Sequence, residues 1–86
     1  MNLLNKTPDE TISEFKKRLY VLKLRDNLFT WDEIVQAVND VVLPQDRRKR
    51  DAYSREAHRL LSEGLLNMDN YPVSEVEENI MENDTI

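Results

Sequence analysis

The sequence predicts a small all-α domain of three or four helices, and three observations support this class. The chain has 86 residues, and a chain of that size forms one domain that buries about 60 % of its unfolded surface. It contains a single glycine, Gly64, although hairpin turns and phosphate-binding loops require glycine at several positions. Apolar residues recur at helical spacing in three successive stretches. We therefore expect a domain over residues 1–66 with helices at about 8–28, 31–42 and 46–63.

Composition argues against an enzyme, a metalloprotein and a secreted protein. There is no cysteine and His58 is the only histidine, so we expect no disulfide, no metal site and no cofactor. The serines have no second imidazole to act as a base, and the carboxylates fall mostly at helix starts or in the tail. The first residues contain no apolar run long enough for a signal peptide or a membrane span. We expect a cytoplasmic binding protein that is not membrane-associated.

The first predicted helix begins at residue 8. Thr7 is suited to cap it, Pro8 fits the first helical position, and Glu10 completes a capping box. One apolar face carries Ile12, Phe15, Leu19 and Leu22, and a second stripe carries Val21, Leu24 and Leu28. We expect the rest of the domain to cover the second stripe, and a homodimer contact is the alternative.

The second predicted helix begins with another capping box, formed by Thr30 and Glu33. The apolar residues that follow share one helical face: Trp31, Ile34, Val35, Val38, Val41 and Val42. Pro44 disfavours helical geometry at the residue before it, so this helix should end near residue 42.

The third predicted helix begins near Asp46 and ends before Gly64, which suits a left-handed carboxy-terminal cap. The connection 43–46 has about the length of the turn in a helix-turn-helix. The core-facing residues of this helix are Tyr53, Ala57, Leu60 and Leu61, and the opposite face carries Arg48, Ala52, Arg55, Arg59 and Ser62.

Charge is distributed unevenly along the chain. The formal net charge is −5, yet residues 15–60 contain eleven of the twelve Lys and Arg and seven of the seventeen acids. Residues 67–86 form an acidic tail with six acids and no Lys or Arg, in which Ser74 and Glu77 are placed to cap a short helix. Such a basic middle region favours a nucleic-acid partner despite the negative net charge.

A row of arginines beside small residues is typical of a helix that enters the DNA major groove, because arginine binds guanine or phosphate with two hydrogen bonds. Four cations at the start of a helix oppose its dipole, unless a phosphate lies nearby. The candidate nucleic-acid-binding residues are Arg47, Arg48, Lys49, Arg50, Arg55 and Arg59. The alternative is a solvated helix with ion pairs four residues apart, Asp51 with Arg55 and Arg59 with Glu63. That alternative does not account for residues 47–50.

Residues 30–66 carry three short motifs. The stretch 30–39 has a threonine, an aromatic residue, a Glu-Ile pair and a later asparagine; residues 50–55 are basic and aromatic; residues 60–64 end in a leucine-to-glycine pattern. This combination resembles the homeodomain- or Myb-like helix-turn-helix modules of many phage-encoded proteins. The resemblance implies a DNA-facing helix that includes Arg48, Arg55 and Arg59, and a core that includes Trp31, Ile34, Val38, Tyr53 and Leu60.

Two functional hypotheses follow. The first is a small regulator of the phage or mobile-element type, active in transcription regulation, that binds duplex DNA through residues 46–63. The second is an inhibitor or adaptor that binds a host or regulatory protein through the acidic tail 67–86 and the apolar stripe at residues 21–28, if that stripe is exposed.

Overall fold

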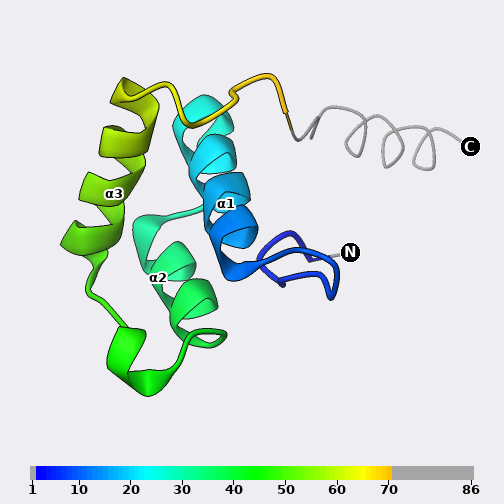
Figure 1. Ribbon diagram of the computed structural model, residues 1–86, viewed down its shortest axis with the longest axis vertical. Helices are drawn as coiled ribbons and strands as arrows, with labels where there is room; N and C mark the ends of the chain where they lie inside the picture. Colours follow the sequence, from blue (N-terminus) through cyan, green and yellow to red (C-terminus); the bar gives the residue numbers. More distant parts are fainter. Residues whose placement is uncertain (1, 71–86) are drawn as a thin grey trace, which may run out of the picture.

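The computed structural model describes residues 2–70, which form three α-helices and one short 3-10 helix (Figure 1). The elements are α1 (Ile12–Asp26), α2 (Trp31–Asn39), η1 (Pro44–Asp46) and α3 (Arg50–Ser62). This part of the chain contains no strand, which confirms the all-α class. None of its helices has the length and apolarity needed to cross a bilayer. The predicted acidic helix near residues 73–80 lies outside the described residues.

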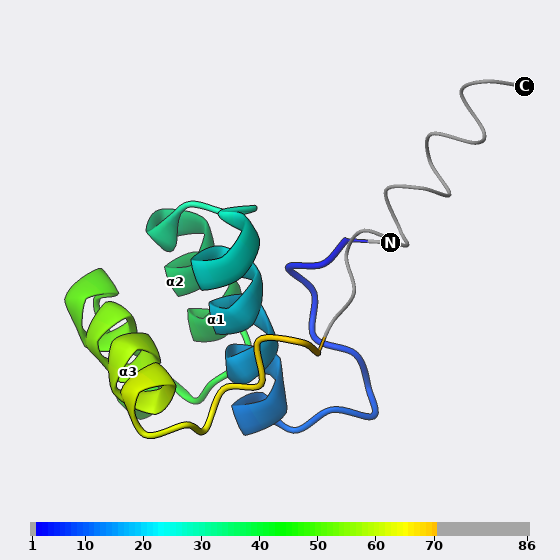
Figure 2. The same ribbon diagram turned by 90° about the horizontal axis from the view of Figure 1, so that it is seen from above.

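The three α-helices are grouped around one core (Figures 1 and 2). Each helix contributes side chains to it, and Leu66 adds one from the segment after α3. The buried members are Phe15, Leu19, Tyr20, Val21, Ile34, Val38, Tyr53, Ala57, Leu60 and Leu66. Trp31 packs against this core half-buried, with its ring 6.0 Å from that of Tyr20.

Helix α1 begins four residues later than predicted, because a second Thr-x-x-Glu motif caps it. Thr11 Oγ1 accepts a hydrogen bond from the Glu14 amide at 3.1 Å, and Glu14 accepts one from the Thr11 amide at 2.9 Å. Thr7 and Glu10 instead form a separate turn, in which Glu10 accepts from the Thr7 amide at 2.9 Å. The predicted cap at Thr7 was therefore wrong. The helix ends at Asp26 rather than at residue 28, because the next residue, Asn27, is left-handed with φ 51°.

The domain covers both apolar stripes of α1 except at Ile12, which is 38 % exposed. Phe15, Leu19 and Val21 are fully buried, and Leu24 packs against the core half-buried. Leu28 is also half-buried. The expectation that the domain covers the second stripe is confirmed. The exposed apolar stripe required by the second hypothesis was wrong, because Val21 is buried and Leu24 and Leu28 are half-buried.

The connection between α2 and α3 differs from the prediction. Helix α2 ends at Asn39, and the connection 40–49 has ten residues, whereas a helix-turn-helix turn has about three or four. Leu43 adopts an extended conformation, as expected before Pro44, so the chain has already left the helix. Val41 and Val42 both donate to the Val38 carbonyl at 3.1 Å, which closes a turn and leaves Val41 36 % exposed. The predicted helix 31–42 and the short turn at 43–46 were therefore wrong.

Helix α3 is shorter than predicted at its start. Asp46 lies in η1, and the capping position belongs to Lys49, whose side chain makes no capping bond. Gly64 has φ 72°, as expected for a residue that reverses the chain after a helix. Leu61 was expected in the core but is 40 % exposed.

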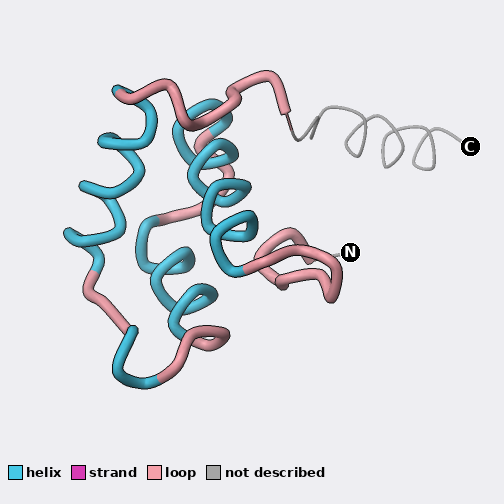
Figure 3. The backbone as a smooth tube through the Cα atoms, viewed as in Figure 1, coloured by secondary structure: helices cyan, strands magenta, loops and turns pink. Residues whose placement is uncertain are grey.

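The segment before α1 lies against α1, and one arginine holds it there (Figure 3). The Arg18 guanidinium donates to the carbonyl of Leu3, to the carbonyl of Asn5 at 2.9 Å, and to both oxygens of Glu10 at 3.2 and 2.8 Å. Burial opposes ionisation of Glu10, but the Arg18 hydrogen bonds outweigh it and hold the pKa of this carboxyl below its ordinary value. Leu4 then packs against the core.

Candidate nucleic-acid interface

The six predicted nucleic-acid-binding residues are all exposed, but they do not form one helical row. Arg47, Arg48 and Lys49 precede α3, and both ends of this stretch have extended backbone, with ψ 137° at Arg47 and 165° at Lys49. Arg50 is the first residue of α3, and Arg55 and Arg59 lie within it. The predicted row that joined Arg48 to the arginines of α3 was wrong, because the helix begins two residues after Arg48. The side chains therefore form two groups, which we call the basic link (residues 47–50) and the α3 face (Arg55 and Arg59).

Asn39, the last residue of α2, positions the basic link. Its Nδ2 donates to the Arg48 carbonyl at 2.9 Å, and its Oδ1 accepts from the Arg48 amide at 3.2 Å. The hydroxyl of Tyr53, in α3, donates to the same Oδ1. The Asn39 carbonyl accepts from Arg47 Nε at 2.9 Å, at the carboxy-terminal end of α2, where cations are favoured. One asparagine thus joins α2, the basic link and α3.

In the sequence, Asn39 stands out only as the asparagine of the pattern shared with helix-turn-helix modules. Asn39 comes directly before the predicted connection, and a polar side chain at a helix end often bonds a nearby backbone. Its partner, however, lies nine residues further along the chain, and spacing alone does not indicate that pairing.

Acidic neighbours compensate only part of the basic surface. Arg59 pairs with Glu63 at 3.1 Å, as the solvated-helix interpretation predicted, and Arg50 lies 3.9 Å from Asp32. All four side chains of these pairs are at least 48 % exposed, so each pair contributes little to stability. Within residues 2–70 neither Lys49 nor Arg55 forms an ion pair, so the predicted pair of Asp51 with Arg55 is not made.

Glu56 is directed away from the α3 face and towards α1. Its Oε1 lies 2.7 Å from Lys16 Nζ and accepts a hydrogen bond from the Tyr20 hydroxyl at 2.6 Å. Burial opposes ionisation of Glu56, but the hydrogen bonds from Lys16 and Tyr20 and the charge of Arg48 outweigh it, so its pKa lies below the ordinary value. Burial of the Tyr20 hydroxyl raises its pKa, and its hydrogen bond to the Glu56 carboxylate raises it further. This network joins α1 to α3 and leaves the outer face of α3 to the arginines.

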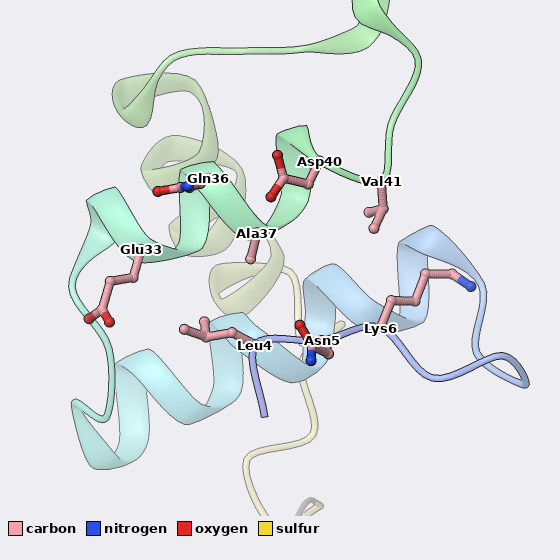
Figure 4. Close-up of a pocket in the computed structure, with 8 residues that line it drawn as sticks. All are labelled: Leu4, Asn5, Lys6, Glu33, Gln36, Ala37, Asp40 and Val41. Atoms are coloured by element: carbon pink, nitrogen blue, oxygen red, sulfur yellow. The ribbon is translucent and has the colours of Figure 1, made fainter. Parts of the chain in front are cut away.

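Two of the concavities on the surface of residues 2–70 border the segments described above. The first, of about 290 Å³, lies between the N-terminal segment and α2 (Figure 4). Its lining residues are Leu4, Asn5, Lys6, Glu33, Gln36, Ala37, Asp40 and Val41. Glu33 is engaged in the cap of α2 and Lys6 donates to the Thr7 carbonyl at 3.2 Å, so two of its charged groups already have partners.

The second concavity, which we call the connection groove, has a volume of about 440 Å³. It lies where the start of α1 meets the connection between α2 and α3. Its lining residues are Ile12, Lys16, Val41, Val42, Leu43, Asp46, Arg48 and Tyr53. Four of its eight lining residues are aliphatic, and it shares Arg48 with the basic link.

His58 lies on the exposed side of α3, and its Nδ1 is 2.8 Å from the Ser54 carbonyl. In the described part of the chain no three His, Cys, Asp or Glu side chains gather as they would around a metal ion. No protein-family model, curated protein or solved structure matches the chain. A functional assignment therefore rests on the arrangement of its exposed charges.

Proposed function

We propose that this protein is a non-enzymatic DNA-binding protein, a small regulator of the phage or mobile-element type, that binds duplex DNA through the basic link and the α3 face. One observation carries the proposal: four consecutive cationic side chains, residues 47–50, are exposed on a backbone that hydrogen bonds hold against α2. Repulsion among these cations destabilises the free protein. A polyanion that contacts all four removes that cost and releases its own counterions.

The two groups have different roles in this proposal. The basic link contacts phosphates, because its first three side chains project from a non-helical stretch that runs into the start of α3. Arg55 reaches the major groove from α3, where Ala52 is small enough to allow close approach. Helices α2 and α3 then act as a helix-turn-helix variant whose ten-residue connection itself carries the phosphate-binding cations.

The negative net charge does not oppose this assignment, because it belongs to the segment after the helical domain. Residues 2–70 contain twelve basic and twelve acidic side chains and are formally neutral, whereas residues 71–86 contain five acids and no Lys or Arg. The local potential at the basic link, rather than the charge of the whole chain, decides how the domain meets a phosphate backbone.

The experiment is fluorescence anisotropy of a labelled mixed-sequence duplex, titrated with the full chain at several salt concentrations. Lys49→Glu and Arg55→Glu test the two groups, and neither side chain has an ion pair within residues 2–70. Lys17→Glu, on α1, is the matched control with the same change in charge. Each lost phosphate contact should reduce the slope of log affinity against log salt by about 1.

We expect Lys49→Glu to weaken binding and lower the salt slope, Arg55→Glu to weaken binding, and Lys17→Glu to bind as the unaltered chain does. Absence of binding at low salt, or equal losses in all three variants, would exclude the proposed surface. The protein-binding alternative would then remain, supported by the connection groove and the acidic segment rather than by the stripe on α1, which is buried.

A further inference from the structure

The connection groove is an apolar surface that no described segment covers. Leu43 is 61 % exposed, Ile12 38 % and Val41 36 %, and all three lie along this groove. Lys16, Asp46 and Arg48 line it as well. Lys16 is paired with Glu56, so Arg48 is the cation of the groove that has no ion pair within residues 2–70. An occupant that fits must offer apolar side chains and carboxylates together.

The chain carries such a segment in residues 71–86. Apolar Val76 and Ile80 are spaced i and i+4, which places them on one face if that part of the segment is helical. The five acids of the segment are not balanced by any Lys or Arg within it. We propose that residues 71–86 dock in the connection groove, with their apolar side chains on Ile12, Val41 and Leu43 and a carboxylate near Arg48.

The segment is long enough to reach the groove. The Asn70 carbonyl accepts a hydrogen bond from Arg25 at 2.7 Å, so the segment starts beside the end of α1. Lys16 lies nine residues before Arg25 on the same helix, which corresponds to about 14 Å. Four or five extended residues cover that distance, at roughly 3.3 Å each, and leave the remainder of the segment to occupy the groove.

Docking would also affect the basic link, and this effect rests on the proposed function. Arg48 lines the groove and belongs to the basic link, so a carboxylate held near it competes with a phosphate. The docked segment would thereby lower DNA affinity without contacting α3. The docking itself does not depend on whether the protein binds DNA.

The test uses the full chain in the absence of DNA. Because the chain has no cysteine, Asn83→Cys introduces a single site for a nitroxide spin label. We expect paramagnetic broadening of the amides of residues 41–43 and of Ile12, and less broadening near Asp26 at the other end of α1. Leu43→Ser should reduce the docking equilibrium constant about tenfold, because it removes most of one leucine's apolar contact. Gln45→Ser, in the same connection but outside the groove, is the matched control and should leave it unchanged.

Equal broadening along α1, or a pattern that Leu43→Ser does not alter, would overturn the proposal. Mixing spin-labelled chain with an isotope-labelled chain that lacks the label separates docking within one chain from docking between copies. Broadening in the mixed sample would likewise overturn docking within one chain. Raising the salt to about 1 M, where the screening length is about 3 Å, should weaken the docking if the carboxylates contribute.

Discussion

Replacing Asn39 with alanine removes the side chain that joins α2, the basic link and α3. The variant loses two hydrogen bonds to the Arg48 backbone and the acceptor for the Tyr53 hydroxyl. Tyr53 is only 2 % exposed as a residue, so its hydroxyl has limited access to water as a replacement partner. Within residues 2–70, the two bonds to Arg48 are the only hydrogen bonds from a side chain of α2 to the backbone of the basic link, and the variant loses both.

The expected loss of stability can be worked from these contacts. An intramolecular hydrogen bond contributes about 0.5–1.5 kcal/mol net, and the two exposed bonds to Arg48 belong at the lower end. The partly buried bond from Tyr53 contributes about 1 kcal/mol. Alanine gains little in helix propensity, because Asn39 is the last residue of α2. We therefore expect Asn39→Ala to lower the free energy of unfolding by about 2 kcal/mol, or the melting temperature by roughly 10 °C.

Urea unfolding followed by the fluorescence of the single tryptophan, Trp31, measures this loss. Gln36→Ala is the matched control, because Gln36 is an exposed amide on the same helix and its side chain makes no hydrogen bond within residues 2–70. It should change stability by less than about 0.5 kcal/mol. If Asn39→Ala destabilises the protein no more than Gln36→Ala does, Asn39 does not anchor the basic link. A double-mutant cycle with Tyr53→Phe then isolates the bond between the two side chains.

Two further predictions concern the polar contacts of α1. The pKa of Glu56 is lowered in the folded state from an ordinary value of 4.5, so its contribution to stability is present above pH 4.5 and is lost as the pH falls through the folded pKa. Glu56→Gln should therefore weaken the acid dependence of the free energy of unfolding, measured by urea titration between about pH 3 and 7, and an unchanged dependence would contradict this assignment. Arg18→Gln removes the cation that holds Glu10, so the pKa of Glu10 should rise towards its ordinary value in an NMR titration, and amide exchange in residues 3–10 should accelerate. A Glu10 pKa that stays low would show that the Thr7 amide and the charge of Lys6 are sufficient to stabilise the carboxylate.

The start of α2 was predictable because its signal is local. Thr30 and Glu33 are three residues apart, and their reciprocal hydrogen bonds form within one helical turn whatever the rest of the chain does. The start of α1 was predicted at the wrong place although the same signal was used. Two Thr-x-x-Glu motifs stand in succession there, and Arg18, eight residues beyond Glu10, engages the first of them.

The six candidate site residues are all exposed, but they are not arranged as predicted. The division into a basic link and an α3 face was not predicted, because it follows from the start of α3 at Arg50. Just before this start, the Asn39 side chain of α2 forms two hydrogen bonds with the Arg48 backbone. Such bonds between α2 and the connection cannot be read from local spacing.

By itself the sequence determined the helical class, the capping box of α2, most of the core-facing side chains and the concentration of cations before and along α3. These depend on interactions within one or two turns, where spacing along the chain and proximity in space coincide. Tertiary structure alone decided which of two capping motifs starts α1, where α3 begins, which partners Glu10 and Glu56 meet and how the basic link is held. Those outcomes depend on Arg18, Asn39 and Glu56 reaching partners eight to thirty-six residues away, and such pairings arise only once the helices have packed.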